Sequence, residues 1–463
     1  MGNAISPEEQ LKKATEDLLD FGLAWFENTN VYKKKRNKIS YRGFFVDLGG
    51  EENAGSGKAR KRQIYTVHHS HKGTNYDKLP LVLVHGYSQS AGQFFGAAPA
   101  IANEYEGPVY SIDMYGCGLS SRPPWTLGYG DDVALDVAEG YFIDTLEEWR
   151  AKMNFKKVIL CGHSIGGYLS VAYAEKYTDN VEELVLLSPV GLPEQNLEKH
   201  MEGTLPWYFR LARALWARGW GPFNTTSISS RLPKIYSSKR YRDCSWIPKD
   251  LLGEQLYLNW VGGDFSHGGV AHCTLLKPGA YARSPLCKRL PVLVDKISKI
   301  SFVYGDRDWM TIDHAVEFLL SCERKMEENK IYSNKYNVRV FQVVGAGHPL
   351  LVDNPLGMVE AVMKSLSSTH RTSSAIEKTG ALPLMYEAGL YEKWGTGAPC
   401  ECLWGDPRKA QYRHATLTTI DTNSGFCSLR WDDNGHTTSE VPIWMLRERV
   451  ETGEGESEKA DPE

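Results

Sequence analysis

The chain has 463 residues, of which 42% are hydrophobic, and its formal net charge is −4. That length accommodates one large catalytic domain and a smaller one, and the composition supplies enough apolar residues for a substantial core. The small net charge excludes the strongly basic profile of a nucleic-acid-binding protein, so we expect no nucleic-acid partner. No apolar run reaches about 18 residues and the N-terminus is polar, so we expect neither a membrane span nor a secretory signal.

Nine cysteines are scattered along the chain without a C-x-x-C pair. An odd, scattered set favours reduced thiols in the cytoplasm over a disulfide framework. Cys400 and Cys402 form one C-x-C pair, for which buried thiols are a commoner explanation than a metal site. We therefore expect no metal and no cofactor. In a cytoplasmic protein the glycosylation sequon at Asn224 stays unused.

The first six residues support two interpretations. Gly2 lies in an M-G-x-x-x-S pattern, which is typical of N-myristoylation. Ser6 and Glu9 also form a capping box around Pro7, followed by apolar residues at helical spacing. Both interpretations stay open.

Two basic clusters follow, at residues 33–38 and 58–62. Such clusters are commonly solvated loops and less often nuclear-localisation signals. Next to a myristoyl chain they would supply the second signal that stable membrane binding needs. Residues 1–62 are therefore predicted to form a helix and basic segment that is a candidate membrane anchor, holding a cytoplasmic protein peripherally on a membrane or lipid-droplet surface.

Residues 63–370 alternate between buried-strand and helix patterns, which predicts an α/β fold with a mostly parallel sheet covered on both faces. The stretch 191–297 breaks this alternation and is rich in tryptophan, which indicates an inserted helical cap. Helices are predicted over 133–150 and after Pro355. The predicted strands are 64–67, 79–85, 108–114, 157–162, 184–188, 299–304 and 338–344.

A second, smaller unit is predicted near the C-terminus. A polar linker at 371–393 leads to residues 394–448, where short strand-like pieces are separated by Ser-Gly and Asn-Gly turns. This pattern predicts a small all-β barrel with strands over 400–404, 412–420, 425–431 and 436–441. The acidic tail at 449–463 is expected to be disordered.

Gly162, Ser164 and Gly166 form a G-x-S-x-G pattern that follows an apolar strand and opens a helix. This context is typical of a nucleophile elbow, in which small residues on both sides let strand and helix approach closely. Ser164 is therefore the predicted nucleophile. A serine hydroxyl needs a base to become reactive.

His348 follows the last predicted strand of the sheet, where an α/β-hydrolase carries its base. Asp308, three residues past Gly305, is the predicted acid that orients this histidine, and Asp306 is the alternative. The order Ser, Asp, His along the chain matches this fold. The amides of Tyr87 and Ile165 are predicted to form the oxyanion hole.

These residues together resemble a branch of the α/β hydrolases that contains the N-acyl-phosphatidylethanolamine lipase, the lysophosphatidic-acid acyltransferase-like proteins and the coactivator of adipose triglyceride lipase. The resemblance covers roughly residues 60–370 and implies a phospholipid or lysophospholipid substrate. It includes segments outside the predicted triad. The similar segments are 120–123, 146–150, 162–167, 279–285, 304–309 and 345–355.

The resemblance also implies an H-x-x-x-x-D motif linked to acyl transfer, which here reads His348 to Asp353. Asp353 also suits the start of a following helix. Pro349 departs from the family, where this position is often large or polar. The coactivator has lost its nucleophilic serine, whereas this chain keeps Ser164, which favours an enzyme over a scaffold.

The C-terminal unit resembles a Tudor-like or SH3-like barrel. Its aromatic residues Trp404, Tyr412, Phe426 and Trp431 either line a cage for a methylated cation on a protein ligand or fill the barrel core. Asn434 stands where Tudor domains often carry a cage tyrosine.

Three functions follow from these observations. The leading hypothesis is a serine hydrolase that cleaves the acyl ester of a lipid through an acyl-enzyme. The second is acyl transfer to lysophosphatidic acid, and the third is a scaffold that regulates a lipase.

Overall fold

The computed structural model describes residues 6–28, 37–54, 58–123, 125–128, 133–194, 231, 235, 238, 241, 246–247, 249–261, 267–277, 281–328, 338–367, 377–379, 395–404, 411–421, 426–442 and 446–449. Gly2, Asn224, most of the basic cluster at 33–38, part of the predicted cap, most of the predicted linker and nearly all of the acidic tail lie outside these residues.

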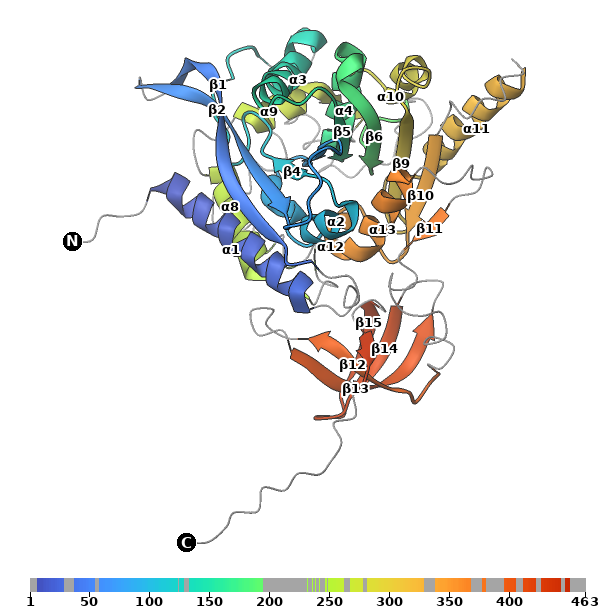
Figure 1. Ribbon diagram of the computed structural model, residues 1–463. Coiled ribbons are helices and arrows are strands. Elements are labelled where there is room, and N and C mark those ends of the chain that lie inside the picture. Colours follow the sequence, from blue (N-terminus) through green and yellow to red (C-terminus); the bar gives the residue numbers. More distant parts are fainter. Residues whose placement is uncertain are drawn as a thin grey trace, which may run out of the picture.

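A nine-stranded sheet forms the centre of the larger part of the protein (Figure 1). Its strands are β1 (Ser40–Ala54), β2 (Lys58–Ser70), β3 (Leu81–Val84), β4 (Val109–Ile112), β5 (Val158–His163), β6 (Val181–Leu187), β9 (Lys299–Gly305), β10 (Val338–Val343) and β11 (Glu377–Thr379). They are ordered β1-β2-β4-β3-β5-β6-β9-β10-β11. From β4 to β11 every neighbouring pair is parallel, whereas β2 is antiparallel to both β1 and β4. The predicted α/β fold with a mostly parallel sheet is confirmed.

The central strands are buried on both faces because helices cover the sheet on both sides. In β3, Leu81 and Leu83 join the apolar core on one face, and Val82 and Val84 join the core on the other. A strand buried in this way needs apolar residues at successive positions, which is why the sequence shows continuous apolar runs rather than alternation.

The helices divide between the two cores. Residues of α1 (Pro7–Asn28), α2 (Ala98–Tyr105), α8 (Lys249–Val261), α12 (Leu350–Asp353) and α13 (Pro355–Leu366) belong to the first core. Residues of α3 (Leu135–Lys152), α4 (Ile165–Lys176), α9 (His267–Leu275), α10 (Leu286–Arg289) and α11 (Asp313–Glu328) belong to the second. Among the helices that the structure describes, none combines the length and apolar character that crossing a bilayer requires.

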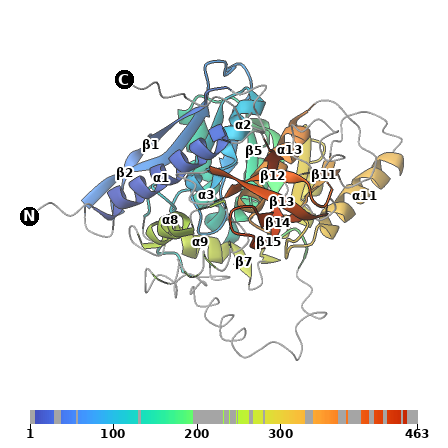
Figure 2. The same ribbon diagram turned by 90° about the horizontal axis from the view of Figure 1, so that it is seen from below.

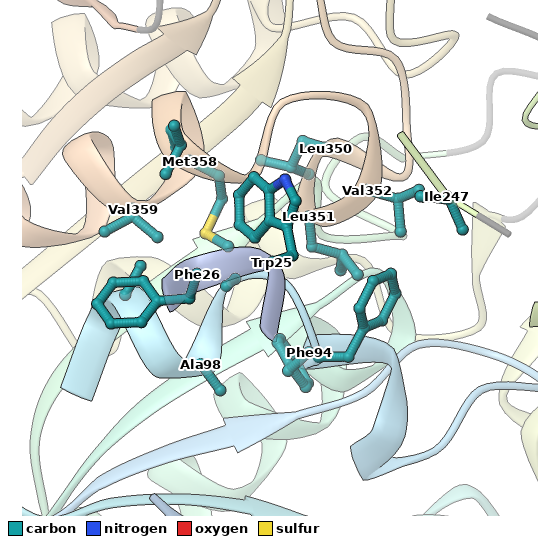
Figure 3. Packing of buried hydrophobic residues seen from close by; sticks show 14 of the residues in the cluster. Trp25, Phe26, Phe94, Ala98, Ile247, Leu350, Leu351, Val352, Met358 and Val359 are labelled. Carbon is teal, nitrogen blue, oxygen red and sulfur yellow. The ribbon is translucent and has the colours of Figure 1, made fainter. Parts of the chain in front are cut away.

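Helix α1 packs against the catalytic part of the chain. Its start is capped reciprocally, since the Ser6 amide donates to Glu9 Oε2 (2.9 Å) and the Glu9 amide donates to Ser6 Oγ (3.2 Å). The contact is close, because a Cβ at Gly22 would lie 2.0 Å from the carbonyl oxygen of Phe95. Figure 3 shows Trp25 and Phe26 of α1 among buried side chains of α2, α12 and α13. The apolar face of α1 is therefore buried inside the fold.

The second basic cluster lies on β2 and faces acidic side chains. Lys61 Nζ is 3.1 Å from Asp47 Oδ2 on β1, and Arg62 Nη1 is 3.0 Å from Glu148 Oε2 on α3. Strands β1 and β2 extend the sheet on the N-terminal side of residue 63, where the sequence-based boundary lay. Likewise, Glu377–Thr379 of the predicted linker forms β11, at the edge of the sheet.

A separate five-stranded antiparallel sheet follows, seen in red and orange in Figure 1 and from below in Figure 2. It consists of β12 (Pro399–Trp404), β13 (Gln411–Asp421), β14 (Phe426–Trp431), β15 (Thr437–Pro442) and β16 (Leu446–Glu448), in the order β15-β14-β13-β12-β16. The small C-terminal all-β unit was predicted, apart from the short strand β16.

Candidate functional site

Ser164 occupies the sharp turn between β5 and α4. Its backbone has φ +55°, a strained value for a residue with a side chain. A Cβ at Gly162 would lie 2.4 Å from the carbonyl oxygen of Gly166, and a Cβ at Gly166 would lie 2.5 Å from the carbonyl oxygens of Val84 and His85. The turn therefore requires glycine on both sides of the serine, as a nucleophile elbow does.

His348 lies between Ser164 and Asp308. Its Nε2 is 3.0 Å from Ser164 Oγ, and its Nδ1 is 3.2 and 3.3 Å from the two carboxylate oxygens of Asp308. Burial acts to raise the pKa of Asp308, but the hydrogen bond and charge of His348, together with hydrogen bonds from Ser188 and the Met310 amide, outweigh it, and the pKa lies below its ordinary value. An ionised Asp308 holds the proton on Nδ1, which leaves Nε2 free to accept the proton of the serine hydroxyl.

Two further acids hold the backbone around His348. Asp306, the alternative acid from the sequence, is exposed and its Oδ1 accepts a hydrogen bond from the Ala346 amide (3.1 Å). Asp353 Oδ2 accepts from the Gly347 amide (2.8 Å). The helix start expected at Asp353 is capped instead by Asn354, whose Oδ1 accepts from the Gly357 amide (2.9 Å). The structure thus brings Asp308 to the imidazole, while Asp306 and Asp353 bind the loop that carries it.

The loop after β3 borders the nucleophile. A Cβ at Gly86 would lie 3.2 Å from the Cβ of Ser164, so the backbone at Gly86 and Tyr87 passes beside the serine. His85 Nε2 accepts from the Met114 amide (3.0 Å), which places the ring proton on Nδ1, where it donates to the Gly86 carbonyl (2.8 Å). Burial lowers the pKa of His85 to about 4, so this ring is neutral at pH 7. The second predicted donor, the Ile165 amide, is at the first residue of α4.

Three polar residues near the site were not identified from the sequence. Gln89 Oε1 accepts from the Gly86 amide (3.0 Å) and lies 3.1 Å from His163 Nδ1. His163 Nε2 lies 2.9 Å from the backbone oxygen of His348. Asn259 on α8 donates to the carbonyls of Ser88 and Gln89. The one sequence signal was on α8, where Gln255 and Asn259 are polar residues four apart in an apolar helix.

The remaining predicted site residues lie away from this centre. Among the predicted cage residues, the structure describes the side chain of Trp431, which is 3% exposed; those of Trp404, Tyr412 and Phe426 lie outside the described side chains. The guanidinium of Arg413 stacks 4.6 Å from the centroid of the Trp431 ring, and the indole Nε1 donates to Thr438 Oγ1 (2.8 Å). One face of this ring is thus covered by a cation of the chain itself.

The buried thiols of Cys400 and Cys402 belong to the same core as the β14 and β15 side chains. Within the described residues no group of three or more metal-ligating side chains occurs. The pair therefore packs as apolar side chains in the small sheet.

Comparison with known proteins supports the same fold. Residues 80–220 match the family described as "alpha/beta hydrolase fold". The chain is 30% identical to the "1-acylglycerol-3-phosphate O-acyltransferase ABHD5" of Sus scrofa, over 63% of this chain and 78% of that protein. It is also 30% identical to the "Probable 1-acylglycerol-3-phosphate O-acyltransferase" of Oryza sativa subsp. japonica and the "1-acylglycerol-3-phosphate O-acyltransferase" of Arabidopsis thaliana.

The two plant matches cover 61% of this chain, which spans 66% of the rice protein and 65% of the Arabidopsis protein. The pig match, by contrast, covers more than two thirds of its relative. With the parallel sheet and the glycine-flanked serine turn, these matches mean that the chain belongs to the α/β-hydrolase family, in the group of the ABHD5 and 1-acylglycerol-3-phosphate O-acyltransferase relatives.

Proposed function

We propose that this protein is a serine acyl hydrolase that cleaves the carboxylic ester of a lipid, a phospholipid or lysophospholipid. The observation that carries the proposal is the distance of 3.0 Å between Ser164 Oγ and His348 Nε2, with the Asp308 carboxylate on the opposite ring nitrogen. These are the distances at which a histidine accepts a proton from a serine hydroxyl.

The reaction would proceed in two displacements. His348 Nε2 takes the proton of Ser164 while Oγ forms a bond to the ester carbonyl carbon, and the amides of Tyr87 and Ile165 stabilise the oxyanion. The C–O bond to the alcohol then breaks, and His348 returns the proton to the departing oxygen. Water, deprotonated by the same imidazole, attacks the acyl-enzyme, and Ser164 recovers its proton as the fatty acid leaves.

Acyl transfer is the second candidate function. The rice, Arabidopsis and pig relatives carry the name 1-acylglycerol-3-phosphate O-acyltransferase. In this case a lysophospholipid hydroxyl replaces water in the second step, and the first step is unchanged. The two functions differ only in the acceptor, so both require Ser164 and His348.

The experiment combines an activity-based probe with product analysis. A fluorophosphonate should label the wild-type protein but not the Ser164→Ala variant. It should also label the control variant Ser301→Ala, which removes a buried strand hydroxyl with no hydrogen-bond partner among the described residues. With an acyl-labelled phospholipid and added lysophosphatidic acid, labelled free fatty acid supports hydrolysis and labelled phosphatidic acid supports transfer. A folded wild-type protein that no fluorophosphonate labels would refute both and leave the scaffold hypothesis.

A further inference from the structure

Helix α8 of the cap region lies against the loop that follows β3. At its C-terminal end, Asn259 is 6% exposed and uses both ends of its amide. Its Nδ2 donates to the carbonyl of Ser88 (2.8 Å) and to the carbonyl of Gln89 (2.9 Å). Its Oδ1 accepts from the amide of Gly118 (2.9 Å) and from Arg122 Nη2 (3.1 Å). The orientation of the amide is therefore determined, because reversing it would set donors against donors.

The loop that Asn259 binds is a tight turn that contains Tyr87. The Gln89 amide donates to the Gly86 carbonyl (3.2 Å), and the Gly86 amide donates to Gln89 Oε1 (3.0 Å). Ser88 has φ +60°, a conformation that costs free energy in a residue with a side chain. A strained conformation of this kind persists only where surrounding contacts hold it, and Asn259 supplies two of them.

One turn earlier on the same helix, Gln255 binds the next part of the loop. Its Nε2 donates to Ser90 Oγ (2.6 Å), and its Oε1 accepts from Gln93 Nε2 (3.1 Å). Residues four apart lie on one face of a helix, so α8 presents a polar stripe to residues 88–93. Both side chains are buried and each meets polar groups of the loop with its amide, so this face of α8 is matched to the loop by hydrogen bonds as well as by shape.

We propose that Asn259 is a positioning residue through which the cap helix α8 holds the oxyanion loop. It fixes the carbonyls of Ser88 and Gln89, and so the direction of the Tyr87 amide that we assign to the oxyanion. The inference rests on the proposed hydrolase function. It also links catalysis to the cap, because any movement of α8 relative to the sheet displaces the amide that stabilises the transition state.

The test is Asn259→Asp, which keeps the shape of the side chain and its acceptor for Gly118 and Arg122. The change replaces the donor to the two loop carbonyls by an oxygen. We expect kcat for a p-nitrophenyl acyl ester to fall on the order of 10- to 100-fold with KM within about twofold of wild type, because a misplaced donor weakens the transition state and not substrate binding. Affinity for a phenylboronic acid, which forms an anionic tetrahedral adduct on the serine, should fall in parallel.

Asn103→Asp is the matched control. Asn103 is also buried, lies on α2, and binds the Asn37 amide and Glu104, away from the serine. The Asn103→Asp variant should have a lower melting temperature than wild type and an unchanged kcat. If Asn259→Asp does not fold, Asn259→Ala removes the same donors without adding charge and should show the same split between kcat and KM.

Three outcomes decide the matter. A selective loss of kcat and boronate affinity in the Asn259 variant supports the inference. Wild-type values of both, or losses that follow the melting temperature equally in the Asn259 and Asn103 variants, overturn it while the hydrolase function stands. A folded wild type that no fluorophosphonate labels overturns the proposed function and this inference together.

Discussion

Replacing Asp308 by asparagine tests the proposed triad at its most buried member. The Asp308 side chain is 0% exposed, and its Oδ1 accepts a hydrogen bond from the Met310 amide (2.9 Å). In Asp308→Asn the side-chain oxygen will keep the Met310 bond, so the amide nitrogen will take the place of Oδ2, the oxygen that forms the hydrogen bond with His348 Nδ1. Two donors cannot share that contact, and the imidazole must move its proton to Nε2.

A proton on Nε2 faces the hydroxyl of Ser164 and prevents the ring from accepting the serine proton. In serine proteases the equivalent change lowers kcat about 10⁴-fold. Each factor of ten corresponds to about 1.4 kcal/mol, so the loss of transition-state stabilisation is about 5.5 kcal/mol. The variant should lose some stability near neutral pH, because the lowered pKa of Asp308 means that its ionised form stabilises the folded state, so the melting temperature is measured beside kcat.

The assay is steady-state hydrolysis of a p-nitrophenyl acyl ester, with fluorophosphonate labelling rate as a second readout. Asp306→Asn is the matched control, since Asp306 is two residues away and exposed, and the hydrogen bond described for its side chain comes from the Ala346 amide. Its kcat should stay within about tenfold of wild type. An Asp308→Asn enzyme that keeps more than about a tenth of wild-type kcat, or an Asp306→Asn enzyme that loses as much as Asp308→Asn, would refute the assignment.

Two further predictions concern packing and pH. Gly166→Ala places a Cβ 2.5 Å from two carbonyl oxygens and should lower the free energy of unfolding by about 1–3 kcal/mol and kcat by about 100-fold. The control is Gly269→Ala, whose new Cβ has no heavy atom within 4 Å and which should raise the free energy of unfolding by up to about 1 kcal/mol. Urea denaturation and steady-state kinetics compare the two variants, and equal behaviour would contradict the elbow geometry. The ring of His272 stacks 4.4 Å from that of Phe142, and burial, with a smaller effect of nearby His85, lowers its pKa from 6.5 to about 3. Between pH 3 and pH 6.5 the imidazole is protonated in the unfolded chain but not in the folded protein, so the wild-type protein loses stability as the pH falls. His272→Phe should therefore be more stable than wild type by about 2 kcal/mol at pH 5 and by much less at pH 7.5. Urea denaturation at both pH values measures the difference, and a difference that does not change with pH would contradict a buried neutral ring.

The regular part of the fold was predictable from the sequence. The strand at 157–162 was predicted because its apolar run ends at a glycine before Ser164, and the structure has β5 at Val158–His163. Strand β1 was missed, because Ser40–Ala54 mixes charged, glycine and aromatic residues. Strand β1 pairs antiparallel with β2 and buries apolar side chains mainly on the face toward α3, so its sequence lacks the continuous apolar run of a strand buried on both faces. Strand β11 was missed because three residues carry no periodicity.

The site residues also divide into those that the sequence predicts and those that depend on the tertiary structure. Ser164 and His348 follow from local motifs, because an elbow needs glycine at fixed positions and the base follows a strand. Asp308 was predicted as the acid and Asp306 as the alternative, since both follow the same strand within three residues. Their separation depends on the turn at Gly305–Asp308, whose amide-to-carbonyl bond (3.3 Å) directs one carboxylate to His348 and the other to the backbone of Ala346.

By itself, the sequence determined the alternation of strands and helices in the large sheet, the position of the nucleophile turn and the presence of a second, all-β unit, because these depend on local spacing and on which residues a buried strand accepts. Only the tertiary structure decided that the apolar face of α1 is buried within the fold, that Lys61 and Arg62 of β2 are paired with acids, and that Asn259 reaches the loop beside Ser164. These contacts join residues far apart along the chain, and no local pattern of side chains encodes which distant backbone group they will meet.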